Sequence, residues 1–160
     1  MCVTRLPLIA CLLAVPLTVH AEELRLPYTA ETKPIAMQTH PVGSDTGHVL
    51  GVAAFDGTAR VDGEDAQHGY AGQIELTDGA GTIRGYAHWS FDDGSSITAR
   101  YEGIVYAASD NSKIDFEATW QEVQGSGRYD GASGSGVFSG KRIEGGKTRI
   151  AGELNLTVPD

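Results

Sequence analysis

The chain has 160 residues, a length that suits one domain preceded by an export segment. It carries 12 Lys and Arg against 21 Asp and Glu, which gives a formal net charge of −9. This acidic balance argues against nucleic acid or an anionic membrane surface as a partner, because both attract clustered basic side chains.

Residues 1–21 have the features of a signal peptide. Arg5 supplies the positive charge, an apolar run covers 6–19, and residues 19–21 (Val-His-Ala) form a small-residue cleavage site. The apolar run is too short and too interrupted by proline to span a membrane. We therefore expect a secreted or periplasmic protein without membrane insertion. Both cysteines lie in this segment, so the exported chain would contain no disulfide.

The rest of the chain is expected to form one β-barrel domain over residues 35–160, after an N-terminal leader at 22–34 that contains two prolines. Helical periodicity is missing from the sequence, and strand-length runs are separated by Gly, Asp, Asn and Ser. The runs lie near 34–40, 48–60, 68–77, 80–91, 95–106, 113–123, 132–143 and 148–158. Eight such runs predict an all-β fold, an eight-stranded antiparallel barrel or a sandwich.

Several runs alternate strictly between apolar and polar residues, so each has one buried and one wet face. The apolar face of the central runs contains Ile83, Gly85, Ala87, Trp89, Phe91, Ile97, Ala99, Tyr101, Gly103, Val105, Phe116, Ala118 and Trp120.

The loop at 92–94 (Asp-Asp-Gly) sets the register of one hairpin, because a three-residue loop of this kind places its glycine in the left-handed conformation. Trp89 is then opposite Ile97. On the outer face, Arg84 is opposite Glu102 as a favourable charged pair.

Small residues recur on the apolar face, at Gly72, Gly85, Ala87, Gly103, Ala118 and Gly152. They leave two interpretations open. They can leave room for a ligand, as in barrels that hold one small molecule, or they can relieve strand curvature while aromatic rings fill the space. The candidate ligand-binding residues, each of which also suits a plain core position, are Phe55, Tyr70, Trp89, Tyr101, Phe116 and Trp120.

Four histidines follow the export segment, at His40, His48, His68 and His88, and none has the short spacing that is usual for ligands on one strand or helix. We interpret them as surface histidines, and we expect neither a metal site nor a cofactor.

The glycine-rich stretch at 125–138 reads Gly-Ser-Gly-Arg-Tyr-Asp-Gly-Ala-Ser-Gly-Ser-Gly-Val-Phe. Glycines here are expected at positions of positive φ or close backbone approach. The pattern Gly-Ser-Gly-x-aromatic-acid-Gly-x-x-Gly resembles the allene oxide cyclase barrel family and, more loosely, the Gly-x-Gly-x-Phe element of dirigent proteins. A softer likeness to bacterial barrels of this group extends over about 80–158, through residues 93–103.

The resemblance implies a calycin-like barrel and, in the cyclases, cofactor-free cyclisation of a fatty-acid epoxide. No catalytic residue is carried over, because Glu31 is followed by Thr-Lys-Pro and not by the family's Ser-Pro stretch. Our leading expectation is binding of a small apolar, lipid-like molecule inside the barrel. The alternatives are a cofactor-independent isomerase or cyclase, and an envelope structural or interaction protein with a filled barrel. Dirigent proteins often trimerise, which leaves an oligomer open.

Overall fold

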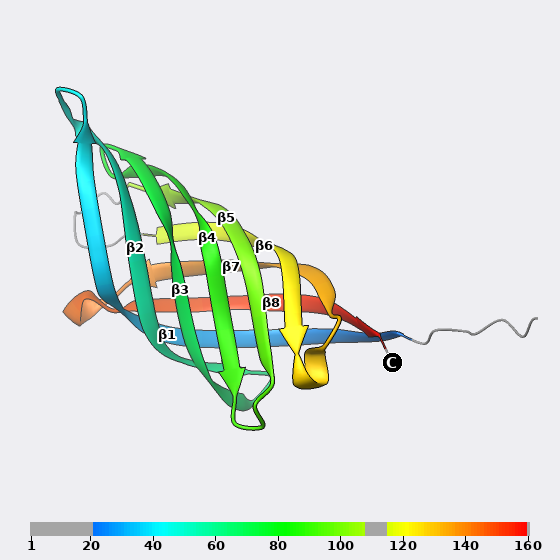
Figure 1. The fold of residues 1–160 in the computed structure, drawn as a ribbon. Coiled ribbons are helices and arrows are strands. Elements are labelled where there is room, and N and C mark those ends of the chain that lie inside the picture. The colour runs from blue at the N-terminus through cyan, green and yellow to red at the C-terminus, as the bar shows by residue number, and fades with distance from the viewer. Residues whose placement is uncertain (1–20, 108–114, 160) are drawn as a thin grey trace, which may run out of the picture.

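The protein is a closed antiparallel β-barrel in which every strand pairs with its sequence neighbours and the last strand pairs with the first (Figure 1). The structure, a computed structural model, describes residues 21–107 and 115–159. Its strands are β1 (Ala21–Val42), β2 (Asp45–Val61), β3 (Glu64–Thr77), β4 (Ala80–Phe91), β5 (Ser96–Tyr106), β6 (Asp115–Ser126), β7 (Ser133–Arg142) and β8 (Thr148–Pro159). The predicted eight-stranded antiparallel barrel is confirmed, and the sandwich is excluded.

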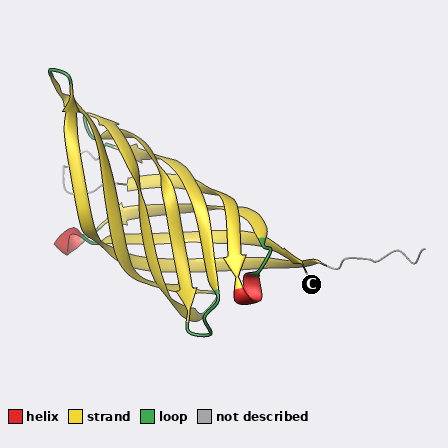
Figure 2. Ribbon diagram, viewed as in Figure 1, coloured by secondary structure: helices red, strands yellow, loops and turns green. Residues whose placement is uncertain are grey.

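Two short 3₁₀ helices, η1 (Gly127–Tyr129) and η2 (Glu144–Gly146), lie at opposite ends of the barrel (Figure 2). Within 21–107 and 115–159, no helix is long and apolar enough to cross a membrane. Residues 1–20 of the expected signal peptide, and 113 and 114 of the expected sixth strand, lie outside the described ranges.

The predicted leader at 22–34 is instead the first half of β1, where it pairs with β8 from Ala21↔Pro159 to Thr32↔Thr148. The two prolines of this segment fit because each lies where β1 has a strand partner on one side only. Pro27 precedes the first β1–β2 pair and Pro34 follows the last β1–β8 pair. Proline lacks a backbone N–H, so it is tolerated where one side of the strand is unpaired.

The hairpin between β4 and β5 has the predicted register. Gly94 adopts a φ of +83°, which is the left-handed conformation expected of it. Trp89 pairs with Ile97 and Ala87 pairs with Ala99. The alternation of β4 and β5 therefore places the predicted apolar face, which includes Trp89 and Ile97, inside the barrel.

Arg84 and Glu102 also lie directly opposite each other on the outer face. Each side chain also forms a hydrogen bond with a different residue. Arg84 Nε donates to Gln73 Oε1 at 2.9 Å, and Glu102 accepts from Arg100 Nη1 at 3.2 Å. The predicted position of Arg84 opposite Glu102 is thus confirmed. The hydrogen bond of Arg84 is to a residue of β3, and that of Glu102 is to a residue of its own strand.

The glycine-rich stretch leaves β6, forms η1 and re-enters the barrel as β7. Gly127 and Gly131 have φ values of +63° and +71°. A Cβ added at Gly127 would lie 2.9 Å from Ser95 Cβ, and one at Gly131 would lie 2.8 Å from Pro159 Cγ. Both glycines thus combine positive φ with close approach, as expected for this stretch.

Helix η1 covers one end of the barrel interior. Tyr129 is buried there, and the Arg128 guanidinium lies 4.6 Å from the centre of the Phe91 ring and 4.9 Å from that of Tyr129. Arg128 also forms ion pairs with Glu64 and Asp93. These contacts tie the β2–β3 turn, the β4–β5 turn and η1 together, so this end is closed.

Candidate ligand-binding cavity

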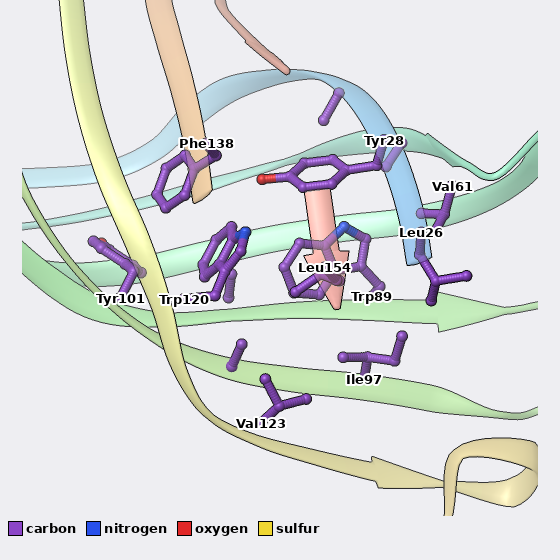
Figure 3. Packing of buried hydrophobic residues seen from close by; sticks show 14 of the residues in the cluster. Leu26, Tyr28, Val61, Trp89, Ile97, Tyr101, Trp120, Val123, Phe138 and Leu154 are labelled. Carbon is purple, nitrogen blue, oxygen red and sulfur yellow. The ribbon is translucent and has the colours of Figure 1, made fainter. Parts of the chain in front are cut away.

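The barrel interior is divided into a packed half and an open half. The packed half adjoins η1 and contains Trp89, Ile97, Leu154 and Leu156, whose side chains are fully buried. Figure 3 shows Trp89, Ile97 and Leu26 gathered on one side of the core and Tyr101, Trp120 and Phe138 on the other.

The open half contains a cavity of about 120 Å³, which we call the barrel cavity. Its lining comes from Met37, Ala53, Phe55, Tyr70, Gly72, Ile74, Leu76, Ile83, Tyr101, Val105, Phe116, Trp120, Phe138, Arg142, Thr148 and Ile150. Exposed Met37 and Arg142 mark its mouth, at the end of the barrel where β7 leads into η2. The wall is almost entirely apolar.

Five of the six residues predicted to bind a ligand line this cavity: Phe55, Tyr70, Tyr101, Phe116 and Trp120. The sixth, Trp89, does not. Its ring lies 5.0 Å from that of Trp120 and 5.4 Å from that of Tyr28, both edge to face, in the packed half. Trp89 is therefore a core residue of the closed end.

Sequence reasoning did not select Met37, Ala53, Ile74, Leu76, Ile83, Val105, Phe138, Arg142, Thr148 and Ile150 as site residues. For β3 the signal was present, since Ile74 and Leu76 continue the period-two series of Tyr70 and Gly72. No sequence pattern indicated that Arg142 lines the cavity, because its position there depends on where β7 ends relative to the cavity mouth.

Aromatic rings build the inner wall. Tyr70 stacks on Phe55 with 4.5 Å between ring centres, and Trp120 stacks on Phe138 at 4.0 Å. Tyr101 stands between these two pairs, edge to face with Tyr70 at 6.3 Å and with Trp120 at 6.0 Å. Because each ring is held by another, the wall is rigid and preformed.

The two phenols are the main polar groups on the wall away from the mouth. Burial raises the pKa of Tyr70, and the hydroxyls of Thr32 and Thr148 partly offset that rise. Burial also raises the pKa of Tyr101, with a further contribution from Tyr70, and no hydrogen bond from a described residue offsets it. Both side chains therefore remain neutral O–H donors at physiological pH.

The interior glycines serve close packing more than they create the cavity. Gly72 and Gly85 are paired across β3 and β4, and the Tyr101 hydroxyl lies over them, 2.8 Å from a Cβ added at Gly85. Gly103 and Gly152 do not line the cavity, since a Cβ there would meet neighbouring strands. Close approach of neighbouring strands therefore accounts for glycine at these two positions.

His68 lies on the inner face of β3, 1% exposed, so the expectation of a surface histidine is wrong for it. Its Nδ1–H donates to the carbonyl oxygen of His88 at 3.1 Å, and its ring stacks on Trp89 at 4.8 Å. Nε2 has no hydrogen-bond partner among the described residues. Burial lowers the pKa of His68 to about 4, so the ring is neutral at pH 7.

The wall of the barrel cavity has few polar or ionisable groups. Within the two described ranges, no three His, Cys, Asp or Glu side chains lie together as a metal site. The described residues that line the cavity include neither Asp nor Glu. What the cavity offers is apolar surface, aromatic faces and two neutral phenols.

Comparison of the chain with models of known protein families found no match, and comparison with curated proteins found none either. The likeness of residues 125–138 to the allene oxide cyclase barrel family therefore remains a sequence-based expectation.

Proposed function

We propose that the protein is an exported β-barrel that binds a small apolar molecule in the barrel cavity. The observation that carries this proposal is the division of the interior into halves. One end is packed and closed by η1, while the other holds an apolar cavity with a preformed aromatic wall. Small-molecule sites are concave and mostly apolar, with a few polar groups that fix orientation.

The size of the cavity limits its occupant. At about 120 Å³ it is somewhat smaller than the apolar cavity of roughly 150 Å³ that holds benzene in an engineered lysozyme. We infer that it takes one ring, or the end of an alkyl chain whose remainder extends past Met37 and Arg142 at the mouth. A whole fatty acid would not be enclosed.

The other two functions that the sequence left open have less support. An isomerase or cyclase would need a group that moves a proton beside the ligand, and the raised pKa values of Tyr70 and Tyr101 keep both phenols protonated. A filled barrel would leave no space in the interior, whereas only the half that contains Trp89 is filled.

The matched substitutions Ala53→Leu and Ala54→Leu test the proposal. Ala53 lines the cavity, while its neighbour Ala54 faces the opposite side of β2 and does not. Calorimetric titration with methylenecyclopentane should show saturable binding to the wild type and to Ala54→Leu. Ala53→Leu should weaken binding by roughly tenfold or more, because the added side chain must overlap the ligand or strain the wall.

Equal binding by all three proteins would contradict the cavity as the site. Absence of saturable binding to the wild type would contradict the proposed function and favour an interaction protein. Gly103→Leu is unsuitable as a filling variant, since its Cβ would meet Ala118 and Glu117 on β6.

Export is a separate expectation. Cleavage after Ala21 would leave Glu22 as the first residue, and Glu22 is already paired with Val158 in the β1–β8 ladder. The expected cleavage site thus coincides with the start of the barrel. N-terminal sequencing of protein from a periplasmic or secreted fraction should begin at Glu22. A sequence that begins at Met1 in that fraction would contradict the signal peptide.

A further inference from the structure

The Tyr101 hydroxyl is a hydrogen-bond donor on the cavity wall for which the described residues provide no partner. Tyr101 is 5% exposed and lines the cavity. The glycine pair Gly72 and Gly85 leaves room for its oxygen, and a Cβ at either position would contact it. The backbone of β3 and β4 therefore lies close to this hydroxyl, but no hydrogen bond between them is found among the described residues.

A hydroxyl that borders an apolar cavity without a hydrogen-bond partner is poorly satisfied, because an apolar ligand would desolvate it without compensation. Tyr70 differs in this respect, since the hydroxyls of Thr32 and Thr148 lie near its own. Arg142 also lines the cavity, but it is exposed at the mouth, where water already solvates its charge. The indole N–H of Trp120 also lacks a partner among the described residues, but its nitrogen is enclosed by protein atoms and a ligand in the cavity does not reach it. Tyr101 is therefore the lining donor for which a ligand oxygen has most effect.

We propose that Tyr101 is a specificity residue that donates a hydrogen bond to a carbonyl or ether oxygen of an otherwise apolar ligand. This inference rests on the proposed function. The surroundings select a neutral acceptor, since the phenol offers a proton but no charge, and the neighbouring wall of Phe55, Trp120 and Phe138 would leave a carboxylate without a counter-ion. The ligand class is thus a small ketone, ester or ether with a hydrocarbon body.

Cyclopentanone and methylenecyclopentane form a matched pair of probes, because they differ only in C=O against C=CH₂. The hydrocarbon would leave the phenol desolvated and unpaired, so the wild type should bind the ketone about tenfold more tightly, after correction for the difference in the probes' hydration. Tyr101→Phe should abolish this corrected preference, and it should bind methylenecyclopentane at least as tightly as the wild type does, because no phenol is left to desolvate. Tyr86→Phe, at an exposed tyrosine of the outer face, is the control and should retain it.

The outcomes separate the two proposals. If neither probe binds the wild type, the proposed function fails and this inference fails with it. If both bind with equal corrected affinity, the cavity binds ligands but the hydrogen bond is absent. If the preference survives in folded Tyr101→Phe, another group makes the bond and the assignment to Tyr101 is wrong.

A second measurement does not depend on the folding of the variant. The infrared C=O stretch of cyclopentanone bound to the wild type should lie below its frequency in hexane, because a phenol O–H donates to it. An unshifted stretch in the bound state would overturn the inference.

Discussion

Lowering the pH from 7 to 5 is expected to destabilise the protein by about 2 kcal/mol through His68 alone. Burial among apolar rings lowers the pKa of His68 to about 4, from an ordinary value of 6.5 in the unfolded chain. Between these two values the unfolded state binds a proton and the folded state does not. Stability therefore falls as the pH decreases through 6.5 toward 4, and it is fully retained above that window.

Urea denaturation at pH 7 and pH 5 measures this loss, and His68→Phe isolates it. The Phe ring can occupy the space against Trp89 without titrating, so the variant should lose little stability over the same interval. His88→Phe, at an exposed histidine, should behave as the wild type does. Glu31 and Asp93 have pKa values below the usual range, so the stability they contribute is lost only at lower pH. An equal loss in wild type and His68→Phe would contradict a buried neutral His68.

Replacing Gly127 or Gly131 with Val is expected to lower the free energy of unfolding by roughly 1–3 kcal/mol in each case. Two costs combine at these positions. A β-branched residue is strained at φ values of +63° and +71°, and its Cβ would press on Ser95 or Pro159. Since η1 closes one end of the barrel, the strain acts on the packed half.

Gly145→Val is the matched control for this effect. Gly145 has a φ of +74°, but a Cβ there would meet nothing within 4 Å. It should therefore show the backbone cost without the contact cost, and the Gly127 variant should unfold at a lower temperature. Thermal melts of the Gly127 and Gly131 variants that match the wild type would remove the structural role of the glycine-rich stretch.

The features that the sequence predicted correctly are local ones. Strand alternation identifies the inner face of β4 and β5, and Gly94 sets the register between them, because both signals extend over only a few residues. The first half of β1 was missed because Pro27 and Pro34 suggest a break. Their tolerance depends on which side of the strand is paired, and that is decided by β2 and β8, far away in sequence.

The position of the cavity could not be derived in the same way. Trp89 and Trp120 share the inner face and the same alternation, yet only Trp120 borders the cavity. A period of two gives the face of a residue and not its depth along the barrel axis, which depends on the registers of all eight strand pairs. The inward position of His68 is different, because His68 belongs to the same period-two series of β3 as Tyr70 and Gly72, so the sequence did contain the signal for its face.

The most direct measurement is a crystal structure of the protein grown with methylenecyclopentane. The barrel cavity predicts electron density for one ligand between Tyr101, Trp120 and Phe138, with the rings of the packed half around Trp89 unchanged. An empty cavity at saturating ligand, or side chains that fill the space in the crystal, would contradict the account.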